Sequence, residues 1–88
     1  MLHASHPQII LRLRRAHGHL ASVISMIEGG KPCVDIAQQL RAVESAVSNA
    51  KRELIQDHID HCLEGAVGQG GREAKAAMAE VKTITKYL

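Results

Sequence analysis

The apolar residues of this 88-residue chain recur at helical spacing, most clearly in its central stretch. Between Cys33 and Cys62 there is no glycine or proline, and one apolar row advances in steps of 4, 3, 4, 3 and 4. The row consists of Ile36, Leu40, Val43, Val47, Ala50 and Leu54. Steps of three and four are typical of the seam between packed helices. The pattern therefore predicts a helix from about Pro32 to Leu63 or Glu64, with one apolar face.

A second row with the same spacing precedes this stretch and consists of Ile9, Leu13, Ala16, Leu20, Val23 and Ile27. It predicts a helix over residues 7–28, which Pro7 opens, because proline suits the first turn of a helix. Gly29 and Gly30 end this helix, since glycine readily adopts the left-handed conformation of a C-cap. Only residues 29–32 separate the two helices, and a turn this short makes them antiparallel neighbours.

A third helix is predicted after a glycine-rich break, in which residues 65–71 include four glycines. It runs from about Arg72 to Leu88, and charged residues alternate on its polar face. Its apolar row is Ala74, Ala77, Val81, Ile84 and Leu88. The sequence thus predicts an all-α protein with three helices. A chain of 88 residues without an internal repeat is expected to form a single domain over residues 1–88.

Composition supports helix packing and indicates a second subunit. Hydrophobic residues make up 45% of the chain but aromatic residues only 1%, which argues against a β-sandwich. Three long helices in 88 residues leave much apolar surface uncovered, so we expect a second copy to bury it. No apolar run approaches the ~18–20 residues of a membrane span, so no membrane partner is expected. Two cysteines without a secretory signal predict a reducing, cytoplasmic setting.

Cysteine and histidine residues bracket the long central helix. Cys33 stands at its start, and His58 and Cys62 stand four apart near its end, on one face. Cys33 and His58 are 25 residues apart (58 − 33), or roughly 37 Å along a continuous helix. A second copy packed antiparallel would place Cys33 of one chain against His58 and Cys62 of the other. Thiolate and imidazole suit transition metals, so the pattern predicts a metal site formed twice in a dimer.

Three arginines gather in the first predicted helix, at Arg12, Arg14 and Arg15. Arg12, Arg15 and His19 share the face opposite the apolar row. A net charge of +2 does not by itself indicate nucleic acid. Guanidinium forks suit phosphate oxygens, so two interpretations stay open, a DNA-binding face and a solvated basic face.

Other classes of function have less support from the residues. No acid–base pair or oriented nucleophile is visible, so an enzyme is not expected. A thiol-based sensor, in which Cys33 and Cys62 of two chains react with an electrophile or oxidant, stays open. So does a plain helical bundle whose cysteines and histidines face water.

Four segments together resemble the CsoR/RcnR family of bacterial metal-sensing repressors: RLRRAHGHL, the lone Cys33, DIAQQLRAVESAV and HIDHC. The resemblance covers nearly the whole chain. It implies a three-helix protomer, an antiparallel four-helix bundle in the dimer, and a disc-like tetramer that is a dimer of dimers. It also implies a DNA-binding repressor that leaves its operator, typically before an efflux gene, when the effector binds.

The resemblance also implies roles for individual residues. The metal ligands of the family match Cys33, His58 and Cys62. Its DNA-binding basic positions match Arg12 and Arg15, with Arg14 close by. Position 19, commonly glutamine in the family, is His19 in this chain.

The resemblance makes Ni(II) or Co(II) the expected effector, with Cu(I) as the alternative. Copper-sensing members have similar ligands but carry a tyrosine before the first cysteine and a glutamate in the third helix. Here Pro32 and Met78 hold these positions, with Glu80 nearby. Nickel- and cobalt-sensing members add an N-terminal histidine, which His3 or His6 can supply. Nitrogen ligands suit Ni(II) and Co(II), whereas thiolates favour Cu(I).

Two thiol-sensing branches of the family fit this chain less well. Formaldehyde-sensing members use an N-terminal proline, whereas this chain begins Met-Leu. Persulfide-sensing members lack the ligating histidine that His58 supplies. A thiol-based sensor of the formaldehyde or persulfide type is therefore less favoured than metal sensing, but it stays open as an alternative.

Overall fold

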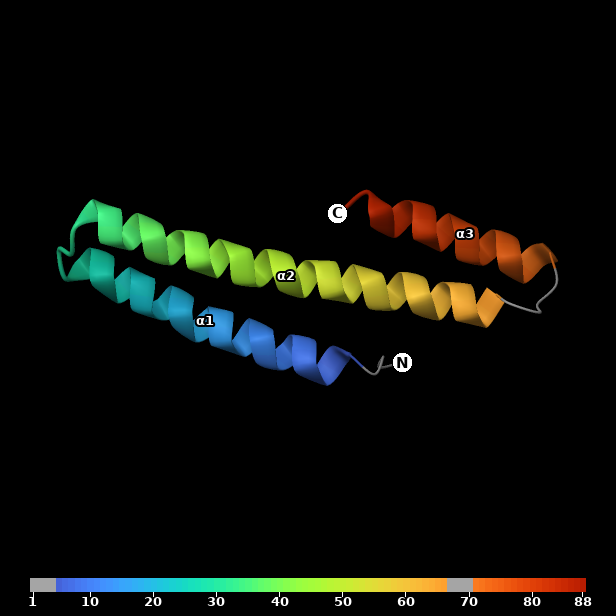
Figure 1. Cartoon of the computed structure of the whole chain (residues 1–88), viewed down its shortest axis with the longest axis horizontal. Coiled ribbons are helices and arrows are strands. Elements are labelled where there is room, and N and C mark those ends of the chain that lie inside the picture. Colours follow the sequence, from blue (N-terminus) through green and yellow to red (C-terminus); the bar gives the residue numbers. More distant parts are fainter. Residues whose placement is uncertain (1–4, 67–70) are drawn as a thin grey trace. The chain divides into compact units, whose positions relative to one another are not determined.

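The computed structural model of the chain contains helices α1, α2 and α3 (Figure 1). It describes residues 5–66 and 71–88, and for residues 62–66 and Glu73 it describes the backbone alone. The helices are α1 (His6–Glu28), α2 (Cys33–Ala66) and α3 (Gly71–Thr85). No strand occurs within the described ranges. This architecture confirms the predicted all-α class with three helices.

The helix ends differ from the predicted ones by a few residues. α2 continues through Gly65 to Ala66, because one glycine costs a helix only ~1 kcal/mol and does not stop it. α3 ends at Thr85 rather than at Leu88. The amides of residues 86–88 instead donate to carbonyls three residues earlier, at 3.1–3.3 Å, which tightens the last turn.

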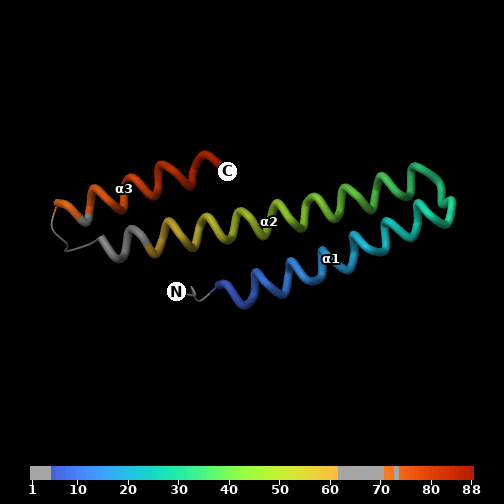
Figure 2. Tube along the Cα trace, turned by 180° about the vertical axis from the view of Figure 1, so that it is seen from behind, coloured from blue at the N-terminus to red at the C-terminus, as the bar shows by residue number. Residues whose placement is uncertain are grey.

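The turn between α1 and α2 is a glycine C-cap, as predicted. Gly30 has a φ of +70°, a conformation that costs glycine no steric clash. The amide of Lys31 donates to the Met26 carbonyl at 3.0 Å, and the amide of Gly30 to the Ile27 carbonyl at 3.1 Å. These two bonds form a Schellman motif. The chain reverses within residues 29–32, so α1 and the start of α2 run antiparallel side by side (Figures 1 and 2).

The chain folds into two compact units, and α2 contributes to both. The first unit is Pro7–Ala50, which contains α1 and the first half of α2. The second unit combines the N-terminal end, through His6, with Lys51–Leu88. In the part of the chain that the structure describes, no helix combines the length and hydropathy that a membrane span requires.

The core of the first unit uses every second member of the predicted apolar rows. Ile9, Ala16 and Val23 of α1 are buried, and so are Val43 and Ala50 of α2. Within each helix these residues are seven apart, so they form one line along it. Ile36, the first member of the α2 row, is only half-buried, so the predicted apolar faces are confirmed for three members of the α1 row and two of the α2 row.

The alternate members of the same rows are exposed. On α1 they are Leu13, Leu20 and Ile27, with 43%, 41% and 57% exposure; on α2 they are Leu40, Val47 and Leu54, with 42%, 45% and 39%. One pair of helices covers only one flank of each apolar face, because the face is wider than a single line of contact. The uncovered flanks are the surface for which the sequence predicts a second copy.

Candidate functional site

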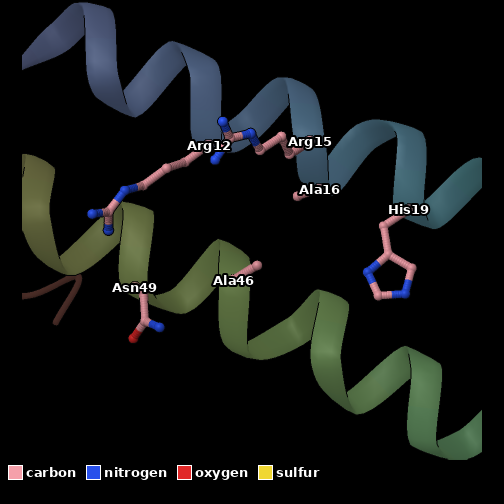
Figure 3. Close-up of a pocket in the computed structure, with 6 residues that line it drawn as sticks. All are labelled: Arg12, Arg15, Ala16, His19, Ala46 and Asn49. Carbon is pink, nitrogen blue, oxygen red and sulfur yellow. The ribbon is translucent and has the colours of Figure 1, made fainter.

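The arginines that were predicted to bind DNA lie on α1, and all are exposed. Arg12 and Arg15 are three apart and His19 follows four residues later, so these side chains share one face of the helix. Figure 3 shows Arg12 and His19 extending from α1 towards α2. The prediction that this face lies opposite the apolar row is therefore wrong: at about 100° per residue the face lies beside the row, and Ala16 of the row borders it. Arg14 is also exposed but lies outside this group, because two residues turn the helix by about 200° from Arg12.

A hollow of about 260 Å³ lies between α1 and α2. It is lined by Arg12, Arg15, Ala16, His19, Ala46 and Asn49 (Figure 3). The lining contains two guanidinium groups and, among the residues that the structure describes, no carboxylate. Such a hollow favours an anion. Sequence reasoning did not group Asn49 with the arginines, because that placement depends on how the two helices are aligned.

His19 is hydrogen-bonded to α2. Its Nε2 lies 2.6 Å from Oε1 of Gln39, and the pair is partly buried. Because an amide oxygen only accepts, Nε2 carries the hydrogen and donates. Figure 3 shows the imidazole on the α2 side of α1, with its other ring nitrogen, Nδ1, on the side of the arginines. The bond therefore holds the ring at the edge of the hollow.

Within the described residues, one chain does not gather the predicted metal ligands. Cys33 is the first residue of α2 and carries an exposed free thiol. His58 follows 25 residues later (58 − 33) in the same uninterrupted helix. No group of three or more His, Cys, Asp or Glu side chains in the described part is arranged to hold a metal ion. A complete set of the predicted kind would require another copy of the chain.

Two of the predicted ligands, His3 and the side chain of Cys62, lie outside the described residues. His6 is described; it is the first residue of α1 and is partly exposed. It belongs to the same compact unit as His58. The fold therefore brings His6 into the compact unit that holds His58, whereas Cys33 belongs to the other unit.

His58 lies against α3, beside Glu80. Its Nε2 is 3.5 Å from Oε2 of Glu80, and the two side chains are 30% and 64% exposed. The family resemblance placed Met78 at the third-helix position, with Glu80 nearby, and in the structure Glu80 is the residue that lies beside His58. Two residues turn a helix by about 200°, so Met78 and Glu80 project in nearly opposite directions. A carboxylate on Nε2 is a common partner of a metal-binding histidine, and it orients Nδ1 as the metal donor.

Comparison with known proteins decides the family. A family model described as a metal-sensitive transcriptional repressor matches residues 5–87. The chain belongs to the CsoR/RcnR family of metal-sensing transcriptional repressors. The match includes all three helices and confirms the resemblance carried by the sequence segments. The family consists of transcriptional repressors rather than enzymes.

Individual members of the family are similar to this repressor over most of its length. The copper-sensing transcriptional repressor RicR of Mycobacterium tuberculosis is 39% identical over 77 residues, which cover 88% of this chain and 80% of that protein. The copper-sensing transcriptional repressor CsoR of Bacillus subtilis is 37% identical over 81 residues, with 90% and 80% covered. Among solved structures, the nickel-responsive transcriptional regulator InrS matches with a TM-score of 0.85 and 26% identity, covering 99% of this chain and 96% of that one. These names establish metal sensing for the family but differ in the metal.

Proposed function

We propose that this repressor binds operator DNA in its metal-free form and leaves the DNA when Ni(II) or Co(II) binds. Release would allow expression of a metal efflux gene in the cytoplasm. The observation that carries the proposal is the match of a metal-sensitive repressor family across residues 5–87. Release requires that the metal bind the DNA-bound protein less tightly than the free protein. Metal binding and DNA binding then weaken each other, which is negative coupling between the two ligands.

The metal site is proposed to form between two copies of the chain. Cys33 of one copy would join His58 and Cys62 of the other. The uninterrupted course of α2 supports this arrangement, because 25 residues of regular helix span roughly 37 Å. Two α2 helices that run antiparallel bring the start of one beside the end of the other, and so would form the site twice.

The exposed apolar flanks support assembly into a dimer and then a tetramer. Each large side chain of these flanks is about two-fifths exposed or more in one chain. Covering such surface stabilises an assembly by ~25 cal/mol per Å² of apolar area. An antiparallel four-helix bundle built from α1 and α2 of two copies would cover both flanks, and two such dimers would form the disc-like tetramer.

The preference for Ni(II) or Co(II) rests on nitrogen ligands from the N-terminal end. His6 lies in the same compact unit as His58, and His3 precedes it by one helical turn of sequence. A histidine from this segment would extend the Cys-His-Cys set with another imidazole, which suits these metals. The similarity to InrS, a nickel-responsive regulator, also supports the preference.

DNA binding is proposed to use the exposed arginines of α1. Arg12 and Arg15 line the anion-favouring hollow, and Arg14 lies beside them on the same helix. Guanidinium groups form paired hydrogen bonds with phosphate oxygens, so they position a protein on the DNA backbone without reading its sequence. A change in helix packing on metal binding would reach the arginines through α2.

Cu(I) is a second candidate, because Glu80 lies 3.5 Å from His58. A third-helix glutamate is the feature that copper-sensing members carry and that Met78 did not supply. Two similar proteins, RicR and CsoR, are named as copper-sensing repressors. A site with two thiolates and one imidazole suits Cu(I), which prefers soft ligands.

A parallel titration tests both candidates. Reduced protein is titrated with Ni(II), Co(II) and Cu(I), while metal–thiolate absorption and release of a labelled duplex are followed together. The duplex is one that the metal-free protein selects from a random-sequence pool. We expect release by Ni(II) or Co(II), and a weaker response when His3 and His6 are both replaced by alanine.

The other outcomes of this titration assign other functions. Release by Cu(I) alone, with no effect of the histidine replacements, would assign the protein to copper. Release by an oxidant or aldehyde in the presence of a chelator would indicate a thiol-based sensor. If the protein selects no duplex and binds no metal, the proposed function is wrong.

A further inference from the structure

We propose that the hollow between α1 and α2 binds one phosphate of the DNA backbone, and that His19 takes up a proton when this phosphate enters. The inference rests on the proposed DNA-binding function and extends it. It adds His19 and Asn49 to the DNA contact, and it makes DNA affinity depend on pH through one named side chain.

The hollow has the chemistry of a phosphate site built from two helices. Arg12 and Arg15 supply guanidinium forks from α1, and Asn49 supplies an amide from α2. Ala16 and Ala46 are small, so they leave about 260 Å³ between the larger polar side chains. Because both helices line the hollow, the affinity for a phosphate there would depend on how α1 and α2 are aligned. A phosphate site on α1 alone would not have this dependence.

The hydrogen bond of His19 determines how its ring can contact a phosphate. Nε2 donates to Oε1 of Gln39 at 2.6 Å, so Nδ1 is the nitrogen on the side of the hollow. In the neutral ring Nδ1 has a lone pair and no hydrogen, and it would repel a phosphate oxygen. In the imidazolium Nδ1–H donates to the phosphate while Nε2–H still donates to Gln39. Each phosphate bound would therefore bring one proton from solvent onto His19.

The groups around His19 make its protonation depend on the bound DNA phosphate. Arg12 and Arg15 of α1 are cationic, while Gln39, Ala46 and Asn49 of α2 are uncharged. Among the described residues that line the hollow there is no carboxylate to pair with the imidazolium, and the phosphate would supply the negative charge. The DNA-bound protein would then hold more protons than the free protein, so DNA affinity is expected to rise as pH falls.

The first test measures operator affinity between about pH 6 and 8.5 at fixed ionic strength, with a chelator present. The probe is the selected duplex. For each His19 engaged, affinity of the wild-type protein is expected to fall by up to about tenfold per pH unit. His19→Gln retains a hydrogen-bond donor but cannot ionise, so this part of the pH dependence should disappear.

His17 provides a matched control, because it is an exposed histidine on the same helix and does not line the hollow. His17→Gln should keep the full pH dependence. If His19→Gln keeps the wild-type slope, or if His17→Gln loses it, the inference is overturned. Far-UV circular dichroism of both variants confirms that α1 and α2 remain helical.

A second test uses the wild-type protein and changes only the DNA. Single phosphates of the selected duplex are replaced by uncharged methylphosphonate linkages, one at a time. At the linkage that occupies the hollow, replacement should lower affinity and remove the pH dependence contributed by His19. If the pH dependence survives at every linkage, no single phosphate is responsible and the inference is wrong.

These experiments separate the inference from the proposed function. Normal release of DNA by metal, together with a flat pH profile in the wild-type protein, would overturn the inference alone. Absence of any selected duplex would overturn both.

Discussion

Two histidines of this protein, His19 and His58, each place Nε2 beside a side-chain oxygen of another helix, but the chemical group that carries the oxygen differs. His58 places Nε2 beside the carboxylate of Glu80, and His19 places Nε2 beside the amide oxygen of Gln39. In both rings the contact makes Nδ1 the nitrogen for further chemistry. A carboxylate is a common partner of a metal-binding histidine, whereas a neutral amide oxygen orients the ring without adding a charge beside it. The partner therefore distinguishes a proposed metal ligand from a proposed DNA contact.

Replacing Cys33 with alanine should separate DNA binding from metal response. The thiol is exposed at the start of α2, so the change removes no packing. Affinity for the selected duplex should stay within about twofold, while metal no longer releases the DNA. The measurement is fluorescence anisotropy of labelled duplex during a metal titration, with the exposed neighbour Val34→Ala as control. Normal metal release from Cys33→Ala would remove this residue from the ligand set.

Replacing Glu80 with glutamine should weaken metal binding without removing a ligand. Loss of the carboxylate beside His58 removes the group that orients the ring, and such changes typically reduce metal affinity by about 10–100-fold. Competition with a chromophoric chelator measures the affinity. Glu44→Gln, which removes an exposed carboxylate of α2 in the other compact unit, should have no effect. Equal affinity of the Glu80 variant and the wild type would show that this contact does not orient His58.

Replacing Arg15 with alanine should reduce the electrostatic part of DNA binding. One lost phosphate contact weakens affinity at low salt and lowers the slope of log affinity against log salt by about one. The slope is measured between about 50 and 200 mM salt on the selected duplex. Arg52→Ala, an exposed arginine of α2 in the other compact unit, serves as the charge-matched comparison. An unchanged slope for Arg15→Ala would contradict its contact with phosphate.

At the scale of elements, features fixed by neighbouring residues could be predicted from sequence. The apolar rows predicted three helices, and Gly29 with Gly30 predicted the reversal between α1 and α2. Contacts between helices could not be predicted, because they depend on how each helix is rotated and aligned. For this reason Asn49 was not grouped with the arginines, and the contact between His58 and Glu80 could not be told from the sequence, which placed Glu80 only near the expected position.

The turn between α1 and α2 gives a direct test of local conformation. Gly30→Ala places a Cβ on a residue with a φ of +70°, which should destabilise the protein by ~1 kcal/mol or more. Gly18→Ala is the contrasting variant, since Gly18 is helical and a Cβ there meets no atom within 4 Å. It should stabilise the helix by up to ~1 kcal/mol. Urea unfolding at one fixed protein concentration measures both changes, and equal effects at the two positions would contradict the conformational argument.

At the scale of the whole molecule, the chain divides its apolar faces between two tasks. One line on each helix forms the core of the protomer, and the alternate line remains exposed. The predicted metal ligands are also divided, since Cys33 and His58 belong to different compact units of one chain. Assembly and sensing would therefore depend on the same surface, and a change that prevents assembly should also prevent metal binding.

Val47→Asp tests this dependence at the middle of the exposed row of α2. Val47 is 45% exposed in one chain, and two α2 helices paired antiparallel to join Cys33 with His58 would cross near it. Two copies would then face each other with like charges in an apolar seam, at a cost of about 3 kcal/mol, or roughly a hundredfold in dimer affinity. Sedimentation velocity should show smaller species, and both metal–thiolate absorption and DNA binding should be lost.

Ser45→Asp adds the same charge to an exposed position about 200° around the helix and should leave assembly intact. Helicity measured by far-UV circular dichroism separates dissociation of the Val47 variant from unfolding. If Val47→Asp dissociates to folded monomers that still bind metal through Cys33 and His58, the site cannot lie between chains. Loss of metal binding at the concentration where the dimer dissociates would instead link the ligand set to the second copy, since no ligand has been altered.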